Sequence, residues 1–262
     1  MAANGGRAAT VFGIDFYAGR FADATAAVLD RARSGRGGYA TLTSVHGVVE
    51  AQHDAAFMHA LAGAWTNFPD GVPVTWAQHR LCGVPAERVC GIDLLPAAVA
   101  AGRDQGVRHY LFGSSPAVLD RLRARLEEQA PGALVVGAAS PPFGPIHRRD
   151  CSEEVERIRA AAPDVVWVGL GAPKQELWMR RNADALRPAV VVGVGAAFDI
   201  VAGMQPRAPF WMQRHGVEWL YRLGREPRRL VGRYARANSE FLARFACAVA
   251  ADRLARRRAS GS

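Results

Sequence analysis

The sequence predicts an α/β fold in which a mostly parallel sheet is covered by helices on both faces. Apolar, strand-like runs alternate with helix-like segments along most of the chain. Several runs, such as DVVWVGLG at residues 164–171, are apolar almost without interruption. Uninterrupted runs are typical of strands that are buried on both faces of a parallel sheet. The 262 residues suffice for one large domain with an appendage.

The predicted strands and helices follow one another in chain order. We expect strands at residues 9–16, 38–45, 108–115, 133–140 and 164–171, and a further strand within residues 189–203. We expect helices at residues 23–33, 47–64, 116–129, 152–162 and 174–186, of which the second is one helix or two. Ser115-Pro116 marks a helix start, because serine favours the N-cap position and proline the position after it.

After Arg207 the pattern is helical throughout. We therefore divide the chain into an α/β core at residues 8–206 and a helical appendage at residues 207–262. Apolar residues recur in the appendage at spacings of three and four, which indicates one helical face. This stripe consists of Leu230, Tyr234, Ala237, Phe241, Phe245 and Val249. Arginines occupy a neighbouring face, so the appendage has an apolar side and a cationic side.

The net charge of +9 lies entirely in this appendage. Residues 207–262 carry 13 arginines and four acidic residues, whereas basic and acidic residues balance in the rest of the chain. Such asymmetry indicates an anionic partner, which is nucleic acid, a phosphorylated ligand or an anionic lipid. A nucleic-acid-binding protein that uses these arginines is one alternative, although no aromatic-rich binding motif accompanies the neutral core. A merely solvated arginine face is the other.

Cysteine usage and hydropathy argue against several classes of protein. The four cysteines are far apart and form no CxxC or Cys/His cluster. We therefore expect no metal site and a reducing, cytoplasmic location. The N-terminus lacks the basic-then-apolar order of a signal peptide. No uncharged apolar run reaches the roughly 18 residues that a membrane span needs.

Polar residues follow three of the predicted strands, at the edge where ligands of such sheets bind. TLTSVH brings Thr43 and Ser44 to one strand end, LFGSSP brings Gly113 and Ser114 to a second, and VGLGAPKQE brings Gln175 to a third. The helix start after Gly113 and Ser114 favours phosphate. No segment matches the P-loop pattern. A Rossmann oxidoreductase is a second alternative, but GVGAAF lacks the full GxGxxG pattern and a following helix.

The stretch NFPDGVPVTW places Asp70 between a proline and a glycine. Pro-Asp-Gly is common turn chemistry, and an aspartate there also caps helices. The same carboxylate is suited to taking a proton from a substrate. The residues alone leave both roles open.

Seven motifs in one order resemble the WecG/TagA/CpsF glycosyltransferases. They are FPDGVPVTW, ERVCGIDLL, YLFGSSPAVL, VGLGAPKQE, GVGAAFDIVAG, RAPFW and VEWLYRLGREPRRLVGRY. The resemblance covers about residues 10–245. It implies a Rossmann-like core and transfer of a sugar, often N-acetylmannosamine, from a UDP-sugar to a polyprenyl-diphosphate-linked sugar. It also implies inversion at the anomeric carbon without a metal ion or other cofactor, at the inner membrane face.

The resemblance implies that Asp70 is the general base, because the aspartate of the family's PDG motif is assigned this role. Thr43 matches a strand-end threonine of the family's catalytic region. The sequence departs from the family at Ser44, where asparagine is usual. A serine offers one hydroxyl in place of an amide, so the donor sugar is open. His46 either joins the site or is structural.

Further binding residues follow from the same motifs. Gln175 and Asp199 are expected to contact the sugar, ribose or diphosphate, with structural roles as the alternative, and Asp93 either binds or caps a helix. Four arginines of the appendage match family arginines and are expected to hold the departing diphosphate: Arg207, Arg222, Arg229 and Arg233. Arginine donates two hydrogen bonds at once to such a group. The apolar stripe is expected to lie on an anionic membrane surface. Core packing is the alternative for Trp219 and Leu220 of VEWLYRL, and self-association remains open.

Overall fold

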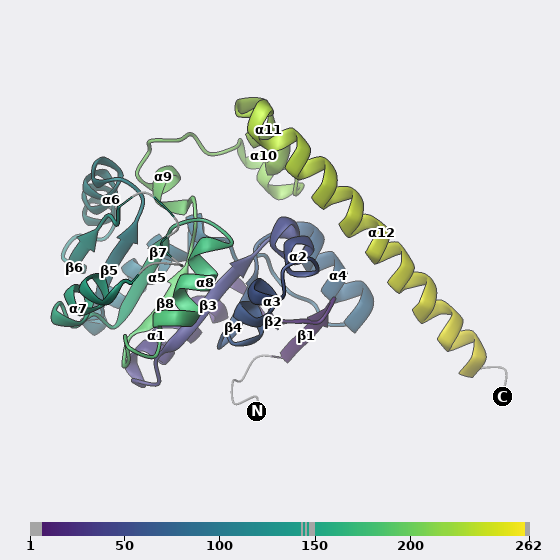
Figure 1. Cartoon of the computed structure of the whole chain (residues 1–262), viewed down its shortest axis with the longest axis horizontal. Coiled ribbons are helices and arrows are strands. Elements are labelled where there is room, and N and C mark those ends of the chain that lie inside the picture. Colours follow the sequence, from purple (N-terminus) through teal and green to yellow (C-terminus); the bar gives the residue numbers. More distant parts are fainter. Residues whose placement is uncertain (1–6, 143, 145, 147–149, 260–262) are drawn as a thin grey trace.

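The computed structural model describes residues 7–142, 144, 146 and 150–259. For Arg7, Arg229, Leu230, Arg233 and residues 255–259 it describes the backbone alone. Figure 1 shows an open sheet with helices on both faces and a long C-terminal helix that leaves the body at one side. The predicted α/β class is confirmed.

The sheet has eight strands in the order β1-β2-β4-β3-β8-β7-β5-β6. Only the pair β1 and β2 is antiparallel, and the other pairs are parallel. The strand bounds are β1 Arg7–Val11, β2 Ile14–Ala18, β3 Gly38–Thr43, β4 Thr66–Pro69, β5 Arg108–Gly113, β6 Leu134–Ala139, β7 Val165–Gly169 and β8 Val190–Gly193.

The helices connect these strands and then continue alone to the C-terminus. Their bounds are α1 Phe21–Arg33, α2 Val45–Ala51, α3 Ala55–Ala62, α4 Val72–Cys82, α5 Gly91–Gly102, α6 Pro116–Gln129, α7 Ser152–Ala160, α8 Lys174–Asn182, α9 Ala197–Val201, α10 Phe210–Arg214, α11 Glu218–Arg225 and α12 Pro227–Ala259, with a 3₁₀ turn at Arg103–Gln105. None of the helices within these described residues combines the length and the apolarity that crossing a bilayer requires.

Several sequence-based expectations about elements are wrong or incomplete, and α4 and α5 are among the elements that were not expected. Residues 9–16 are not one strand, because the chain turns at Phe12 and Gly13, both at positive φ, and forms the β1–β2 hairpin. Strand β4, which ends in the Pro-Asp-Gly stretch, was not expected, since four residues give too short a pattern. A helix does follow the strand at GVGAAF, but α9 has only five residues.

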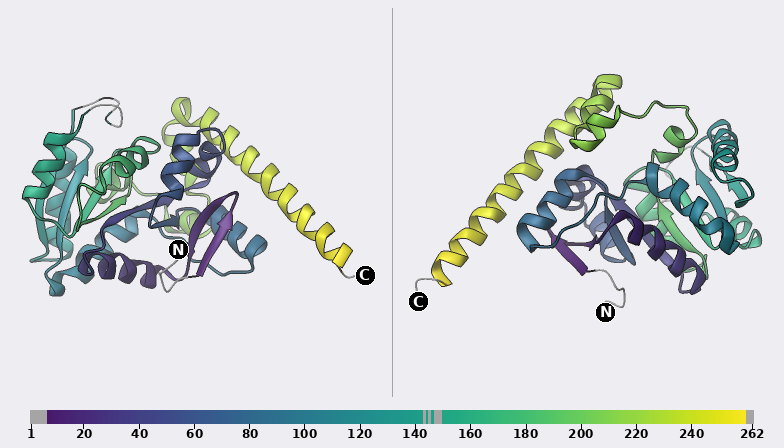
Figure 2. Two further views of the ribbon diagram at one scale, coloured as in Figure 1. Left: turned by 60° about the horizontal axis from the view of Figure 1, so that its bottom comes forward. Right: turned by 180° about the vertical axis from the view of Figure 1, so that it is seen from behind.

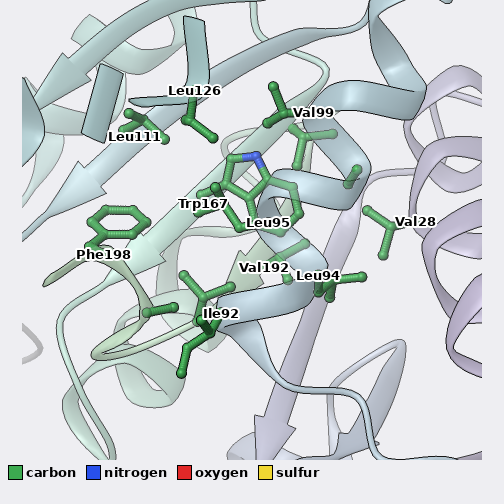
Figure 3. Close-up of a cluster of buried hydrophobic side chains, with 14 of the residues drawn as sticks. Val28, Ile92, Leu94, Leu95, Val99, Leu111, Leu126, Trp167, Val192 and Phe198 are labelled. Carbon is green, nitrogen blue, oxygen red and sulfur yellow. The ribbon is translucent and has the colours of Figure 1, made fainter. Parts of the chain in front are cut away.

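Two apolar layers flank the central strands because neighbouring side chains alternate between the faces. On one face α1, α5, α6 and α9 cover Trp167 and Val192 (Figure 3). On the other face α7 and α8 cover Val166 and Val191, and the Phe112 and Trp178 rings stack at 4.5 Å. The sheet is therefore buried on both sides, as the uninterrupted strands predicted.

The chain leaves the neighbouring parallel strands β3 and β8 toward opposite faces of the sheet. After β3 the chain passes to α2 and α3, and α3 packs on α8. After β8 it passes to α9 on the opposite face, where α9 packs on α5 and α6. Open α/β sheets bind ligands outside the carboxyl ends of the strands at such a point. The fold therefore predicts a ligand site at the carboxyl ends of β3, β4, β7 and β8.

The appendage lies against the β1–β2 end of the body, with α12 packed along α2 and α4 (Figure 2). Ala237 and Phe241 of the apolar stripe are buried in a cluster with residues of β1, β2, α2 and α4, and the Phe241 ring meets Phe12 edge-on at 5.5 Å. The expectation that this stripe lies on a membrane is therefore wrong for these two residues. These two side chains pack on the core instead, whereas Leu220, for which core packing was considered, is exposed.

Replacing Phe241 by alanine should loosen the docking of α12. Truncating a buried phenylalanine typically costs about 3–5 kcal/mol, and Phe241 is 2% exposed. We expect faster amide exchange along α12 and faster tryptic cleavage after Arg236 and Arg244, with the sheet still protected.

Leu242→Ala is the matched control, because Leu242 neighbours Phe241 but is 60% exposed. Equal exchange rates in the two variants would contradict the docking described here.

Candidate active site

A cavity of about 660 Å³ lies beyond the carboxyl ends of β3, β4, β7 and β8. The core contributes Thr43, Ser44, Asp70, Gln175 and Asp199 to its wall. The appendage closes the other side, chiefly with Tyr221, Arg222, Arg225, Glu226 and Tyr234. Five of the predicted site residues of the core and one predicted arginine of the appendage thus meet at one cavity, although they are far apart in sequence.

Asp70 enters this cavity directly from the end of β4. Its N–H donates to the Thr43 carbonyl over 3.1 Å, which ties the segment to the end of β3. Gly71, and not Asp70, is the N-cap residue of α4, and the Asp70 carboxylate accepts from Arg88 over 3.5 Å. Burial raises the pKa of Asp70 above its usual value, and the nearby Arg88 and Arg222 offset this only in part. These features suit a proton acceptor better than a helix cap.

Arg88 joins Asp70 to the appendage. Its Nη2 atom donates to Glu218 Oε2 over 2.9 Å, a shorter contact than the one to Asp70. Glu218 opens α11 and also lies 3.8 Å from Arg222, measured from oxygen to nitrogen. Arg88, Glu218 and Asp70 line both this cavity and a neighbouring groove. One arginine therefore contacts a carboxylate of the core and a carboxylate of the appendage.

Buried hydrogen bonds fix the hydroxyl of Thr43. The Asn67 amide nitrogen donates to the carbonyls of Asp15 and Leu61, so its Oδ1 is an acceptor for Thr41. Thr41 thereby uses its only hydroxyl hydrogen. The 2.9 Å contact between the Thr41 and Thr43 hydroxyls then requires Thr43 as the donor. Thr43 has no hydrogen left to give, and its hydroxyl acts toward any further partner as an acceptor.

Gln175 and Glu176 form a polar pair in the opposite wall. Gln175 Oε1 accepts from the Gly171 N–H over 3.3 Å, and its Nε2 donates to Glu176 Oε1 over 2.8 Å. Both side chains are buried. Burial raises the pKa of Glu176 to about 7, and the bond from Gln175 opposes that rise. The amide of Gln175 is thus held in one orientation.

Asp199 lies in the cavity wall and contacts Ser114, which follows β5 outside the wall. Burial raises the pKa of Asp199, which lines the cavity and accepts from Ser114 Oγ at 3.5 Å. Gly113 and Ser114 are not in the cavity wall. A Cβ on Gly113 would stand 2.5 Å from the Gly169 carbonyl oxygen, so close approach of β5 and β7 already requires glycine there. Their binding of phosphate stays a prediction.

The predicted arginines have different surroundings. Arg222 lines the cavity. Arg207 is not in the wall, and its two terminal nitrogens donate to the Asp93 carboxylate over 2.6 and 2.7 Å. Asp93 lies within α5, whose N-cap residue is Cys90, so it is not the cap. This bidentate pair fastens the start of the appendage to the core. The side chains of Arg229 and Arg233 lie outside the described residues.

Sequence reasoning missed Arg88, Glu218 and Glu176 and left His46 undecided. His46 lines the cavity, next to Ser44. The missed residues lie inside quoted motifs, namely ERVCGIDLL, VEWLYRL and VGLGAPKQE. The motifs were therefore the available signal, but pairing across 130 residues between Arg88 and Glu218 is not visible in a sequence pattern.

A second, more apolar groove of about 430 Å³ adjoins the first cavity. It runs between α4 and the appendage, with walls from Val72, Trp76, Trp219 and Leu242. Trp76 is 60% exposed, which is unusual for so large an apolar side chain. Asp70, Arg88 and Arg222 lie at the junction of the two spaces. The site can therefore accept a ligand that has both a polar part and a long apolar part.

Within the described residues, no group of three or more His, Cys, Asp and Glu side chains is arranged to hold a metal ion.

The chain is similar to known proteins. The family model described as "Glycosyl transferase WecG/TagA/CpsF family" matches residues 9–258. A similar protein from Bacillus spizizenii is named N-acetylglucosaminyldiphosphoundecaprenol N-acetyl-beta-D-mannosaminyltransferase. It is 30% identical to this chain over 181 residues, which cover 69% of this chain and 68% of the relative.

The pKa of Glu176 predicts how pH affects stability. A carboxyl whose pKa rises on folding favours the protonated form, so its contribution is present below about pH 4.5 and is lost as pH rises through about 7. At about 1.4 kcal/mol per pKa unit, the loss is about 3 kcal/mol. We expect urea unfolding to show the wild type losing this much relative to Glu176→Gln between about pH 4 and pH 8.

Glu153→Gln is the control, because Glu153 lies on the exposed side of α7. A Glu176→Gln difference that is constant with pH would show that folding does not change the pKa of Glu176, and would contradict this prediction.

Proposed function

The chain belongs to the WecG/TagA/CpsF family of glycosyltransferases, and from this premise we propose its reaction. The protein transfers a sugar, N-acetylmannosamine or a related one, from a UDP-sugar to a polyprenyl-diphosphate-linked sugar in the synthesis of a cell-surface polysaccharide. The transfer inverts the anomeric carbon and needs no metal ion or other cofactor. The observation that carries this proposal is the half-buried Asp70 carboxylate, with its raised pKa, in the wall of the cavity. Family membership favours this function over nucleic-acid binding and over oxidoreduction.

Asp70 acts as the general base. A sugar hydroxyl is a poor nucleophile until its proton is taken, and a carboxylate with a raised pKa is a stronger base. Inversion requires the base on the face of the sugar opposite the departing UDP. Thr43, whose carbonyl holds the Asp70 N–H, accepts a hydrogen bond from the substrate. Ser44 and Gln175 bind the sugar or the diphosphate, and Asp199 binds hydroxyl groups.

Arginines stabilise the departing UDP. Negative charge grows on the diphosphate as the bond breaks, and preorganised cations at that position lower the barrier. Arg222 and Arg225 face the cavity from α11, and Arg229 and Arg233 follow on the same appendage. The ion pair of Arg207 with Asp93 supports an anchoring role for Arg207. Gly113 and Ser114 remain candidates for phosphate binding.

The apolar groove supports a lipid-linked acceptor. With the reacting sugar at Asp70, its diphosphate lies near Arg222 and its prenyl chain follows the groove past Trp76 and Leu242. The same appendage exposes Phe210 and Trp211, which are 76% and 60% exposed. Exposed aromatic residues beside arginines suit a membrane surface that carries anionic lipid. We place the protein at the inner face of the plasma membrane, bound peripherally from the cytoplasm.

The test of this function is transfer from a panel of UDP-sugars to a synthetic prenyl-diphospho-sugar with EDTA present. We expect wild-type transfer with an inverted product. Asp70→Asn should lower turnover 10²-fold or more, because general-base help is typically worth about 10²–10⁴.

Asp199→Asn serves as the comparison, since it removes a second cavity carboxylate that is not assigned as the base. Near-wild-type turnover by Asp70→Asn would remove it from the base role, and dependence on Mg²⁺ or Mn²⁺ would contradict the metal-free mechanism.

Replacing Phe210 and Trp211 together by serine should weaken binding to vesicles that contain anionic lipid. The two exposed rings supply apolar burial at the surface, at roughly 1.5–3 kcal/mol for each large side chain fully buried. Co-sedimentation with vesicles measures the effect, and turnover on a short-chain soluble acceptor should change little.

The control is Leu134→Ser, which removes an exposed apolar residue from β6 at the other side of the molecule. Unchanged vesicle binding by the double variant would place the membrane contact elsewhere.

A further inference from the structure

We infer that Glu218 is a positioning residue that keeps Asp70 competent as a base by holding Arg88 away from it. Glu218 belongs to the appendage, so Asp70 is competent as a base only while α11 is docked on the core. The inference rests on the role proposed above for Asp70. It adds that Glu218 acts through Arg88, and that loss of Glu218 weakens the base.

Arg88 makes a shorter contact with Glu218 than with Asp70. The Arg88 Nη2 atom lies 2.9 Å from Glu218 Oε2 and 3.5 Å from Asp70 Oδ1. A distance of 2.9 Å is a full charge-assisted hydrogen bond, whereas 3.5 Å is at the limit of one. Glu218 is 7% exposed, so little water competes for this contact. In this arrangement Arg88 makes a full hydrogen bond to Glu218 and only a marginal one to Asp70.

Removing the charge of Glu218 would leave Arg88 with Asp70 as its remaining carboxylate. An opposite charge within about 4–6 Å lowers the pKa of a carboxyl group, typically by 1–3 units. Burial raises the pKa of Asp70, Arg88 and Arg222 lower it, and Glu218 raises it. A closer and unshared Arg88 would therefore make Asp70 a weaker base.

The other charged and titratable groups around Asp70 do not replace Glu218. Burial raises the pKa of the Cys90 thiol, so this group stays neutral near pH 7. His46 of α2 lines the same cavity, and Arg222 of α11 adds a second cation. The charged groups that act on the pKa of Asp70 are Arg88, Arg222 and Glu218. Other titratable or charged groups line the same two spaces, namely His46, Cys90, Glu176, Asp199, His215, Arg225 and Glu226. Glu218 is the carboxylate among the three that act on Asp70, and its loss leaves the two arginines uncompensated.

The decisive measurement is the pH profile of single-turnover transfer by Glu218→Gln, which keeps the shape of the side chain and removes its charge. We expect the acid limb, which reports Asp70, to move down by about one pH unit and the plateau to fall about three- to tenfold, because a weaker base transfers the proton less well. The KM for the donor should change less than the plateau rate. A purely structural role for Glu218 would lower the rate without moving the acid limb.

Two further variants separate this effect from loosened packing. Glu240→Gln removes one negative charge from α12, where Glu240 pairs with His53 and Arg244, and it should leave the acid limb in place. Arg88→Gln removes the cation itself, so the acid limb should move up. It also keeps the inference testable if Glu218→Gln does not fold. In the Arg88→Gln/Glu218→Gln double variant the downward shift should disappear.

Asp70→Asn, measured in parallel, distinguishes the two possible failures. If Asp70→Asn keeps near-wild-type turnover, the base role and this inference fall together. If Asp70→Asn is inactive but Glu218→Gln keeps the wild-type acid limb, the proposed function stands and the inference is wrong. An acid limb that moves down or stays in place in Arg88→Gln would also overturn it.

Discussion

The contact of Arg88 with two carboxylates is the interaction on which the site depends. Asp70 comes from the end of β4 and Glu218 from the first turn of α11, and neither reaches the other directly. The bidentate pair of Arg207 with Asp93 fastens the start of the appendage to the core, and Phe241 of α12 packs on the core. The candidate cavity is therefore complete only when core and appendage are joined, and each half supplies both a carboxylate and an arginine to it.

Much of the fold follows from the sequence because its signals are local and strong. Strands such as β7 are apolar along their whole length, and Ser115 accepts from the Val118 N–H as an N-cap residue should. The hairpin at Phe12 and Gly13 was missed because a turn at positive φ without an Asn-Gly or Asp-Gly pair has no clear signature. The short β4 was missed because its neighbours in the sheet, and not its own pattern, stabilise it.

The candidate site was predictable to the extent that strand ends define it. Thr43 and Gln175 stand at the ends of predicted strands, so their meeting at one cavity follows from the parallel order. Asp70 follows β4, which was not predicted, and only the family resemblance assigned it to the site. Arg207 could not be predicted in this way. Its residue type and motif suggested that it binds phosphate, whereas in the structure it pairs with Asp93. Arg88 and Glu176 were missed because burial and distant partners, which no sequence pattern displays, give them their properties.

The chain of hydroxyls from Asn67 through Thr41 to Thr43 has a chemical consequence for selectivity. Every hydroxyl and amide hydrogen in that chain is already donated within the protein. A group that binds the Thr43 oxygen must therefore donate the hydrogen bond itself. A sugar alcohol or an acetamido N–H satisfies this condition. A fluorine or a methyl ether in the same place has no hydrogen to donate, so its lone pairs would face those of the Thr43 oxygen. The missing hydrogen bond would then weaken binding of such a ligand.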